Sequence, residues 1–245
     1  MTPTDFYPGE DLQAMALASR YRSWYLSFLR PWGATVELGA GLGSNAVDVL
    51  PWVDSLVLVE PAPNLVAGLE ERFRGEPRVR IRPLTAEAWV EEAPDASADC
   101  ILLVNMLEHV ADDRSLVRNL VRVLKPGGCL LVLVPALPWL FSAHDAAVGH
   151  YRRYRFGELG SLAREAGLHL RMLRYFDLLG VLSWGIIKLT RSTSINPKGL
   201  SWYDRLVIPV CRLVEGLLPP PVGKNLLMVA CKSGEDTESR CHSEG

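Results

Sequence analysis

The sequence of 245 residues lacks several features that would assign it to a large functional class. Lys and Arg number 26 against 28 Asp and Glu, so the net charge is −2 and no global positive field is available to hold nucleic acid. No uninterrupted apolar run reaches about 18 residues, so we predict no membrane-spanning helix. The amino terminus has neither a basic nor an apolar stretch, so we predict no signal peptide. We therefore expect a cytoplasmic protein without a nucleic-acid partner.

The 5 cysteines show no spacing that is typical of a metal or redox site. No two of them form a CxxC pair, so we predict neither a zinc site nor a dithiol centre. Cys100 and Cys129 lie in apolar, strand-like runs, where we expect them to be buried and to fill space in the core. This usage favours a reducing compartment.

What the sequence does contain is enough apolar material for one α/β domain, with 49% hydrophobic residues. Strand-like apolar runs alternate with segments of helical periodicity. We expect strands at 34–38, 55–59, 79–82, 99–104, 129–134, 168–175 and 226–232. We expect helices at 11–29, 44–50, 65–73, 86–92, 114–124 and 156–166. This alternation predicts a mostly parallel sheet with helices on both faces.

The organisation of the chain follows from these elements. We predict a single domain over residues 1–232, with an N-terminal helical segment at 1–30, a cofactor-binding core at 34–135 and a helical insertion at 176–218 before the last strand. The insertion is rich in leucine and holds Trp184 and Trp202, so we expect it to cap a pocket with apolar side chains. Lys188 and Arg191 beside its apolar residues leave peripheral membrane contact as the alternative. The polar segment 233–245 is predicted to be a disordered tail.

A glycine-rich turn follows the first predicted strand. Gly39, Gly41 and Gly43 allow the backbone to turn sharply and to approach a ligand. Glu37 ends the strand before the turn, where a carboxylate can receive the ammonium of an amino-acid-like ligand. Glu60 ends the second strand, 21 positions after Gly39, where a carboxylate can bind the hydroxyls of a ribose. A nicotinamide dinucleotide is the alternative, although its fingerprint places the third glycine one residue later.

Four segments together resemble the class I S-adenosylmethionine-dependent methyltransferases, and in particular the group related to ubiquinone-biosynthesis methyltransferases. They are Val36–Asn45, Leu58–Glu60, Asp99–Val110 and Leu124–Gly128. The resemblance implies a Rossmann-like sheet of seven strands, the seventh antiparallel, and S-adenosylmethionine as the cofactor. The cofactor-binding residues that it implies are Glu37, Gly39, Ala40, Gly41, Gly43, Asn45, Glu60, Pro61, Ala86, Glu87, Asn105 and Met106.

The same resemblance implies transfer of a methyl group to a small-molecule or lipid-linked acceptor, at oxygen, in a biosynthetic pathway. A reaction of the sulfonium without methyl transfer, such as cyclisation, and a protein that binds the cofactor without catalysis remain alternatives. Relatives of the group place the pair Glu108-His109 near the acceptor, and some of them bind a divalent metal there. Those relatives have an acidic residue where this chain has Asn105, so we predict no metal.

Titratable residues are also concentrated between residues 141 and 155, after the fifth predicted strand. The pattern D-x-x-x-G-H-x-R-x-Y begins at Asp145, and it resembles a bacterial methyltransferase subgroup. Acceptors at oxygen or nitrogen often need a base, and guanidinium groups bind phosphate or carboxylate. The alternative is a solvated basic turn before the next helix. The candidate catalytic residues are His109, His144, Asp145 and His150, and the candidate substrate-binding residues are Arg152, Arg153 and Tyr154.

Overall fold

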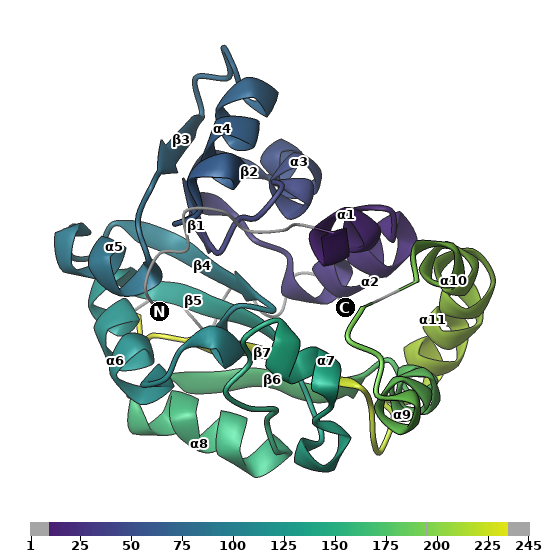
Figure 1. Cartoon of the computed structure of the whole chain (residues 1–245). Helices are drawn as coiled ribbons and strands as arrows, with labels where there is room; N and C mark the ends of the chain where they lie inside the picture. The colour runs from purple at the N-terminus through teal and green to yellow at the C-terminus, as the bar shows by residue number, and fades with distance from the viewer. Residues whose placement is uncertain (1–9, 195, 235–245) are drawn as a thin grey trace.

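The computed structural model describes residues 10–194 and 196–234 and contains one seven-stranded sheet (Figure 1). The strand order is β3-β2-β1-β4-β5-β7-β6. The strands are β1 (Gly33–Leu38), β2 (Val53–Val59), β3 (Val79–Arg82), β4 (Ala98–Val104), β5 (Leu124–Pro135), β6 (His169–Phe176) and β7 (Asn225–Cys231). Neighbours among β1 to β5 pair in parallel, whereas β7 is antiparallel to β5 and β6. The predicted mostly parallel sheet with an antiparallel seventh strand is confirmed.

Helices cover both faces of the sheet, because each carries an apolar face that has to be buried. One core lies under α5 (Ala86–Glu92), α6 (Asp113–Val123) and α8 (Phe156–Glu165). The other lies under α2 (Ser19–Leu29), α3 (Ser44–Val49), α4 (Pro63–Arg72) and α11 (Ile208–Leu217). The remaining elements are α1 (Glu10–Ala16), η1 (Leu50–Trp52), η2 (Leu107–His109), η3 (Pro138–Leu140), α7 (Ala143–Ala147), α9 (Gly180–Thr190), α10 (Pro197–Trp202) and the π-turn η4 (Tyr203–Val207).

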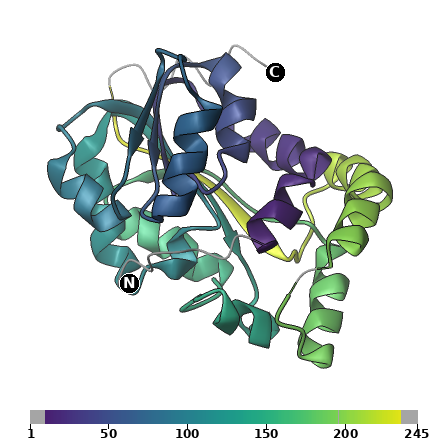
Figure 2. The ribbon, with the colours of Figure 1, turned by 45° about the horizontal axis from the view of Figure 1, so that its top comes forward.

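The segment between β6 and β7 is helical, and α9, α10 and α11 lie together at one outer edge of the molecule (Figures 1 and 2). The N-terminal segment consists of two helices rather than one, with a break at Leu17 and Ala18. Ser233, the first residue of the predicted tail, shares a hydrogen bond with His169 at 2.8 Å. The rest of that predicted tail, 235–245, lies outside the described residues.

The segment around Cys129 differs most from the sequence-based expectation. The predicted start of the fifth strand at residue 129 is wrong, since β5 already begins at Leu124. The backbone of Gly127 donates to Lys232 and that of Lys232 donates to Gly128, so pairing with the end of β7 extends this stretch. The expectation that Cys129 is only a space-filling thiol is also wrong, because it forms a disulfide with Cys231 directly opposite on β7. Cys100 is buried and free, as expected.

Candidate active site

The glycine turn lies at the carboxyl edge of the parallel strands, between β1 and α3. Gly39, Gly41 and Gly43 all have positive φ angles of 76°, 54° and 72°, a region that side chains with a Cβ adopt at a cost. A Cβ on Gly39 would lie 2.9 Å from Met106, whereas a Cβ on Gly43 would lie 2.7 Å from Leu69 of α4. Gly43 is therefore needed for helix packing as well as for the turn. A Cβ on Gly41 would meet only Leu12 of α1, at 3.4 Å.

Glu37 is buried beneath this turn with one carboxylate oxygen unsatisfied. Asn45 Nδ2 donates to its Oε1 at 2.8 Å, while Oε2 has no hydrogen-bond partner among the described residues. Burial raises the pKa of Glu37 to about 8, although the Asn45 hydrogen bond acts in the opposite direction. An unsatisfied buried carboxylate oxygen fits a ligand that brings a cationic group, such as the ammonium of S-adenosylmethionine.

Glu60 holds the turn from the neighbouring strand. Its two carboxylate oxygens accept backbone N–H groups from Gly41 at 2.9 Å and from Ala62 at 3.0 Å. Burial raises its pKa, and these two hydrogen bonds limit the rise. A carboxylate offers about four acceptor positions, so room remains for the hydroxyls of a ribose. The register of β1 against β2 pairs Leu38 with Val59, which brings the ends carrying Glu37 and Glu60 together.

The other predicted cofactor residues surround the same edge. Asn105 follows β4 with φ of 48° and donates its backbone N–H to Leu133, and Met106 covers Gly39. Ala40 and Ala86 are buried, Pro61 is half-buried and Glu87 is exposed. Glu87 and His109 both line a surface hollow of about 280 Å³. The structure thus brings the predicted cofactor residues to one edge, and their contacts with the cofactor stay predictions.

Asp145 organises the second cluster. It is fully buried in a capping box with Ser142 at the start of α7, and its Oδ1 accepts from His150 Nδ1 at 2.9 Å and from Arg153 Nε at 2.9 Å. Burial acts to raise the pKa of Asp145, but the His150 hydrogen bond and the Arg153 charge outweigh it and hold this pKa well below its usual range. Because Asp145 stays ionised, it fixes the proton of His150 on Nδ1 and leaves Nε2 as an acceptor.

Beyond His150 lies a buried carboxyl group without partners. His150 Nε2 is 3.8 Å from Glu108 Oε1, and neither oxygen of Glu108 has a hydrogen bond among the described residues. Burial raises the pKa of Glu108 to about 8. The ring of His109 packs edge-on against that of His150, with centroids 4.6 Å apart. Burial, followed by the charge of His150, lowers the pKa of His109 to about 4, so His109 is neutral near pH 7 and a weak base.

These three residues are also the group that could hold a metal. One ligand atom from each of Glu108, His109 and His150 lies within 4.8 Å of the others. Two imidazoles and one carboxylate are a donor set that several divalent metals accept, and Asp145 behind His150 would orient one ligand. Asn105 is not part of this group. The sequence-based prediction of no metal therefore stays a prediction, although the structure supplies a ligand set that differs from the one implied by the resemblance.

The predicted substrate-binding residues form contacts with other residues of the protein. Arg153 is 4% exposed, and its guanidinium binds Asp145 and the carbonyl of Ala136. Arg152 binds Asp113 at 2.8 Å, and Tyr154 donates to the same carboxylate at 2.7 Å. The alternative of a solvated basic turn is wrong for Arg153, which is buried, whereas the buried Tyr154 agrees with a tyrosine packed beneath such a turn. Through these internal contacts, both arginines hold the loop that carries His150 in place.

An apolar cavity of about 370 Å³ adjoins this cluster, between α1, α9 and α10. Trp184 of α9 lines it and donates its indole N–H to Asp145 at 3.4 Å, while Arg153 lies over the indole ring. Met15 of α1 and Tyr203 also line the cavity. His144 lies edge-on to Trp184, and its Nδ1 is 3.1 Å from the carbonyl of Thr193. His144 therefore packs the loop against the insertion, whereas His150 faces Glu108.

Sequence reasoning did not single out three of these contributors. Glu108 appeared only as the neighbour of His109, Trp184 only as part of an apolar insertion, and Asp113 not at all. A buried carboxylate next to a candidate histidine was visible in the pair Glu108-His109. The contacts of Trp184 and Asp113 connect residues 39 and 41 positions apart, so no local pattern could indicate them.

Comparisons with known proteins agree with this arrangement. A family model described as a methyltransferase domain matches residues 36–132. The ubiquinone biosynthesis O-methyltransferase of Pseudomonas putida is 28% identical over 159 residues, which cover 60% of this chain and 66% of that protein. The match thus spans just under two thirds of the length of this relative.

Solved structures show the same fold. A S-adenosylmethionine-dependent methyltransferase from Thermotoga maritima superposes with a TM-score of 0.61 at 20% identity, over 92% of this chain and 96% of that one. The cyclase SpnF superposes with a TM-score of 0.54 at 18% identity, over 91% and 81%. The predictions of fold, family and cofactor are confirmed, and nothing supports the nicotinamide alternative. By its sequence matches, its sheet order and the acidic residues at its strand ends, the chain carries a methyltransferase domain of the class I S-adenosylmethionine-dependent type, matched over residues 36–132.

Proposed function

We propose that the chain transfers a methyl group from S-adenosylmethionine to a hydroxyl group of an amphipathic, lipid-linked acceptor. The observation that carries this proposal is the pair of the buried Asp145 and the partly buried His150, whose imidazole Nε2 faces a second buried carboxyl group at the carboxyl edge of the sheet. The name of the Pseudomonas putida relative, an O-methyltransferase of ubiquinone biosynthesis, supports the same acceptor chemistry.

The residues of the glycine turn would hold the cofactor. Glu37 Oε2 receives the ammonium, and Glu60 accepts the ribose hydroxyls while its backbone hydrogen bonds keep the turn in place. When bound, the cofactor supplies an electrophilic methyl group on a sulfonium. The main contribution of the protein to such a displacement is alignment of the two reactants.

His150 is the base in this proposal. Nε2 takes the proton of the acceptor hydroxyl, and the ionised Asp145 stabilises the imidazolium that forms. Arg153 and Ser142 hold Asp145 in place without access to solvent. His109 is less suited to this role because its pKa of about 4 makes it a poor proton acceptor near neutral pH.

The apolar part of the acceptor would occupy the cavity between α1, α9 and α10. Its wall includes Met15, Ile187 and Leu200, and Trp184 connects it to the Asp145 cluster. A cavity of about 370 Å³ accommodates part of a prenyl or acyl chain and leaves the polar head near His150. This placement also gives the insertion its predicted role as a cap.

The test combines binding with turnover. Calorimetry should show binding of S-adenosylmethionine and S-adenosylhomocysteine and no binding of NAD. Methyl-labelled cofactor, incubated with hydroxylated prenyl lipids, should transfer label into the organic phase. His150→Gln should lower this rate at least ~100-fold while the affinity for S-adenosylmethionine changes less than about twofold.

His169→Gln is the matched control, since His169 is exposed on β6 and shares a hydrogen bond with Ser233. It should retain the wild-type rate. Cofactor binding without label in any acceptor fraction would favour a non-methylating reaction. Equal loss of activity in both histidine variants would contradict the role assigned to His150.

A further inference from the structure

Exposed apolar side chains are concentrated on the insertion before β7. Among the described residues, 13 large apolar side chains are more than half exposed, and 10 of these lie between Leu182 and Leu218. Leu189 is 85% exposed and Leu217 is 79% exposed. Single exposed apolar residues are normal on soluble proteins, but a concentration of this size on adjacent helices indicates an interaction surface.

The spacing of these residues places them on outward helix faces. Val210, Leu213 and Leu217 on α11 follow one another at intervals of three and four residues, and so do Leu182, Ile186 and Leu189 on α9. The opposite face of α11 is already used, because Ile208 and Cys211 pack in the core. Both helices therefore carry a second apolar stripe that the fold itself does not bury.

The acidic residues of the insertion are buried, whereas its exposed charged residues are basic. From Leu178 to Gly223 there are two acidic residues, Asp204 and Glu215, and both are buried, at 6% and 2% exposure. Asp204 accepts the backbone N–H groups at the start of α2, and Glu215 accepts those of Asp177 and Leu178. The exposed charged residues of this stretch are all basic, and they are Lys188, Arg191, Lys198, Arg205 and Arg212.

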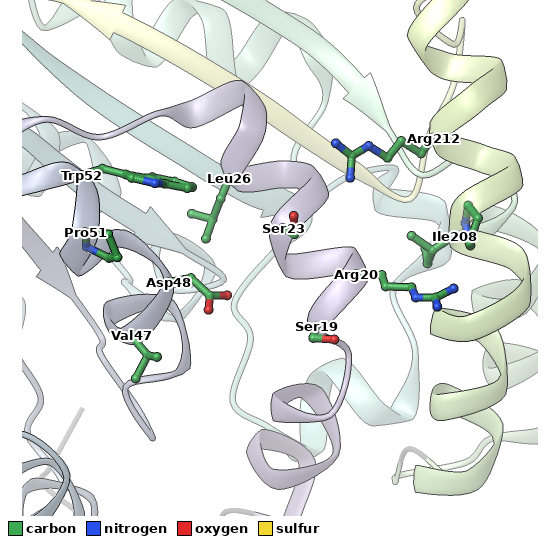
Figure 3. Close-up of a pocket in the computed structure, with 11 residues that line it drawn as sticks. Ser19, Arg20, Ser23, Leu26, Val47, Asp48, Pro51, Trp52, Ile208 and Arg212 are labelled. Carbon is green, nitrogen blue, oxygen red and sulfur yellow. The ribbon is translucent and has the colours of Figure 1, made fainter.

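A groove of about 740 Å³ is lined by residues of α2, α3, η1 and α11. Figure 3 shows Arg20 of α2 and Arg212 of α11 extending their guanidinium groups into the space between the two helices. The acidic residue of the groove, Asp48, is paired with Arg22. Two guanidinium groups from opposite walls suit phosphate oxygens of lipid headgroups.

We propose that the outward face of α9, α10 and α11 docks on the surface of an anionic lipid bilayer. Leucine, isoleucine and tryptophan side chains enter the headgroup region, and the basic side chains contact lipid phosphates. No helix in the described ranges 10–194 and 196–234 is long and apolar enough to cross a bilayer. The basic charge of this face favours an anionic lipid surface over a second copy of this chain, because anionic headgroups attract it whereas two identical basic faces repel.

This inference extends the proposed function, since the apolar cavity is lined by α9 and α10 of the same insertion. A lipid-linked acceptor could then enter from the bilayer side without crossing water. The two proposals are nevertheless separable, because docking can be measured without the cofactor and without turnover.

Co-sedimentation of the full chain with vesicles tests the docking surface. The wild-type protein should bind vesicles of phosphatidylcholine with ~30% phosphatidylglycerol at least tenfold more tightly than pure phosphatidylcholine vesicles, and ~0.5 M salt should remove most of this preference. Leu213→Asp combined with Leu217→Asp should reduce binding at least tenfold. Arg205→Gln combined with Arg212→Gln should abolish the preference for the anionic lipid.

Matched controls lie elsewhere on the surface. Arg80→Gln with Arg118→Gln removes two exposed charges on β3 and α6, and Phe156→Asp changes a partly exposed residue of α8. These variants should bind vesicles like the wild type, and all variants should keep wild-type affinity for S-adenosylmethionine, which shows that they fold. Equal vesicle binding by the insertion and control variants would overturn the proposal. So would a wild-type dimer that the leucine variants convert to a monomer without any vesicle binding by either.

Discussion

Replacement of Gly43 by alanine should reveal that packing, as well as the backbone conformation, requires a glycine at this position. Its φ angle of 72° costs a residue with a Cβ about 1–2 kcal/mol. The added Cβ would lie 2.7 Å from Leu69 and 2.9 Å from Phe73, and relief of such overpacking costs about 1–3 kcal/mol. Gly43→Ala should therefore lower the free energy of unfolding by about 2–5 kcal/mol, out of a typical total of about 5–15 kcal/mol.

Gly68→Ala provides the control within α4, the helix that Gly43 contacts. Gly68 is exposed in the helix interior and a Cβ there would meet nothing within 4 Å, so the change should stabilise the protein by about 0.5–1 kcal/mol. Gly41→Ala should lower the free energy of unfolding only by the cost of the positive φ angle, because its Cβ would make an ordinary contact with Leu12. Urea unfolding followed by circular dichroism measures all three. A loss of unfolding free energy for Gly43→Ala no larger than that for Gly41→Ala would refute the packing argument.

Three further predictions concern ionisation, metals and the disulfide. Because burial raises the pKa of Glu37 to about 8, binding of S-adenosylmethionine at pH 7 should release close to one proton. The affinity for S-adenosylmethionine should then fall up to ~tenfold per pH unit as the pH drops below 8. Calorimetry in buffers of different ionisation enthalpy measures the proton release, which Glu37→Gln should eliminate. If His150 acts as a base rather than as a ligand, EDTA should change the turnover rate less than about twofold, and a loss restored by a divalent metal would contradict the base assignment. The Cys129–Cys231 disulfide closes a loop across 102 positions, so its reduction should lower the free energy of unfolding by about 2–4 kcal/mol. The stability of the double serine variant should no longer respond to dithiothreitol.

The elements that sequence analysis predicted well are those with strong local signals. The apolar runs of β1, β2 and β4 are buried on both faces, and the glycine turn and Glu60 mark their carboxyl ends. These residues bring the cofactor edge together because parallel strands end at the same side of a sheet. The start of β5 was missed since Pro126 and two glycines indicate a turn, while backbone pairing with Lys232 overrides that local preference.

The acceptor side was harder to predict because its geometry depends on contacts between distant segments. Asp145, His150 and Arg153 were identified as a dense polar segment, but the sequence did not indicate that Arg153 would be buried against Trp184. The disulfide was missed for the same reason, since only the antiparallel register of β5 and β7 places Cys129 opposite Cys231. Long-range register is not encoded in any local pattern of residues.

The position of α1 has a consequence for the order of events during turnover. Leu12 lies beside Gly41 of the cofactor turn, and Met15, one turn later, lines the apolar cavity. One short helix thus borders both the cofactor turn and the apolar cavity. A displacement of α1 that admits or releases one ligand therefore also loosens the contacts around the other ligand. We expect cofactor exchange to slow when a lipid analogue fills the cavity, and product release to limit the steady-state rate.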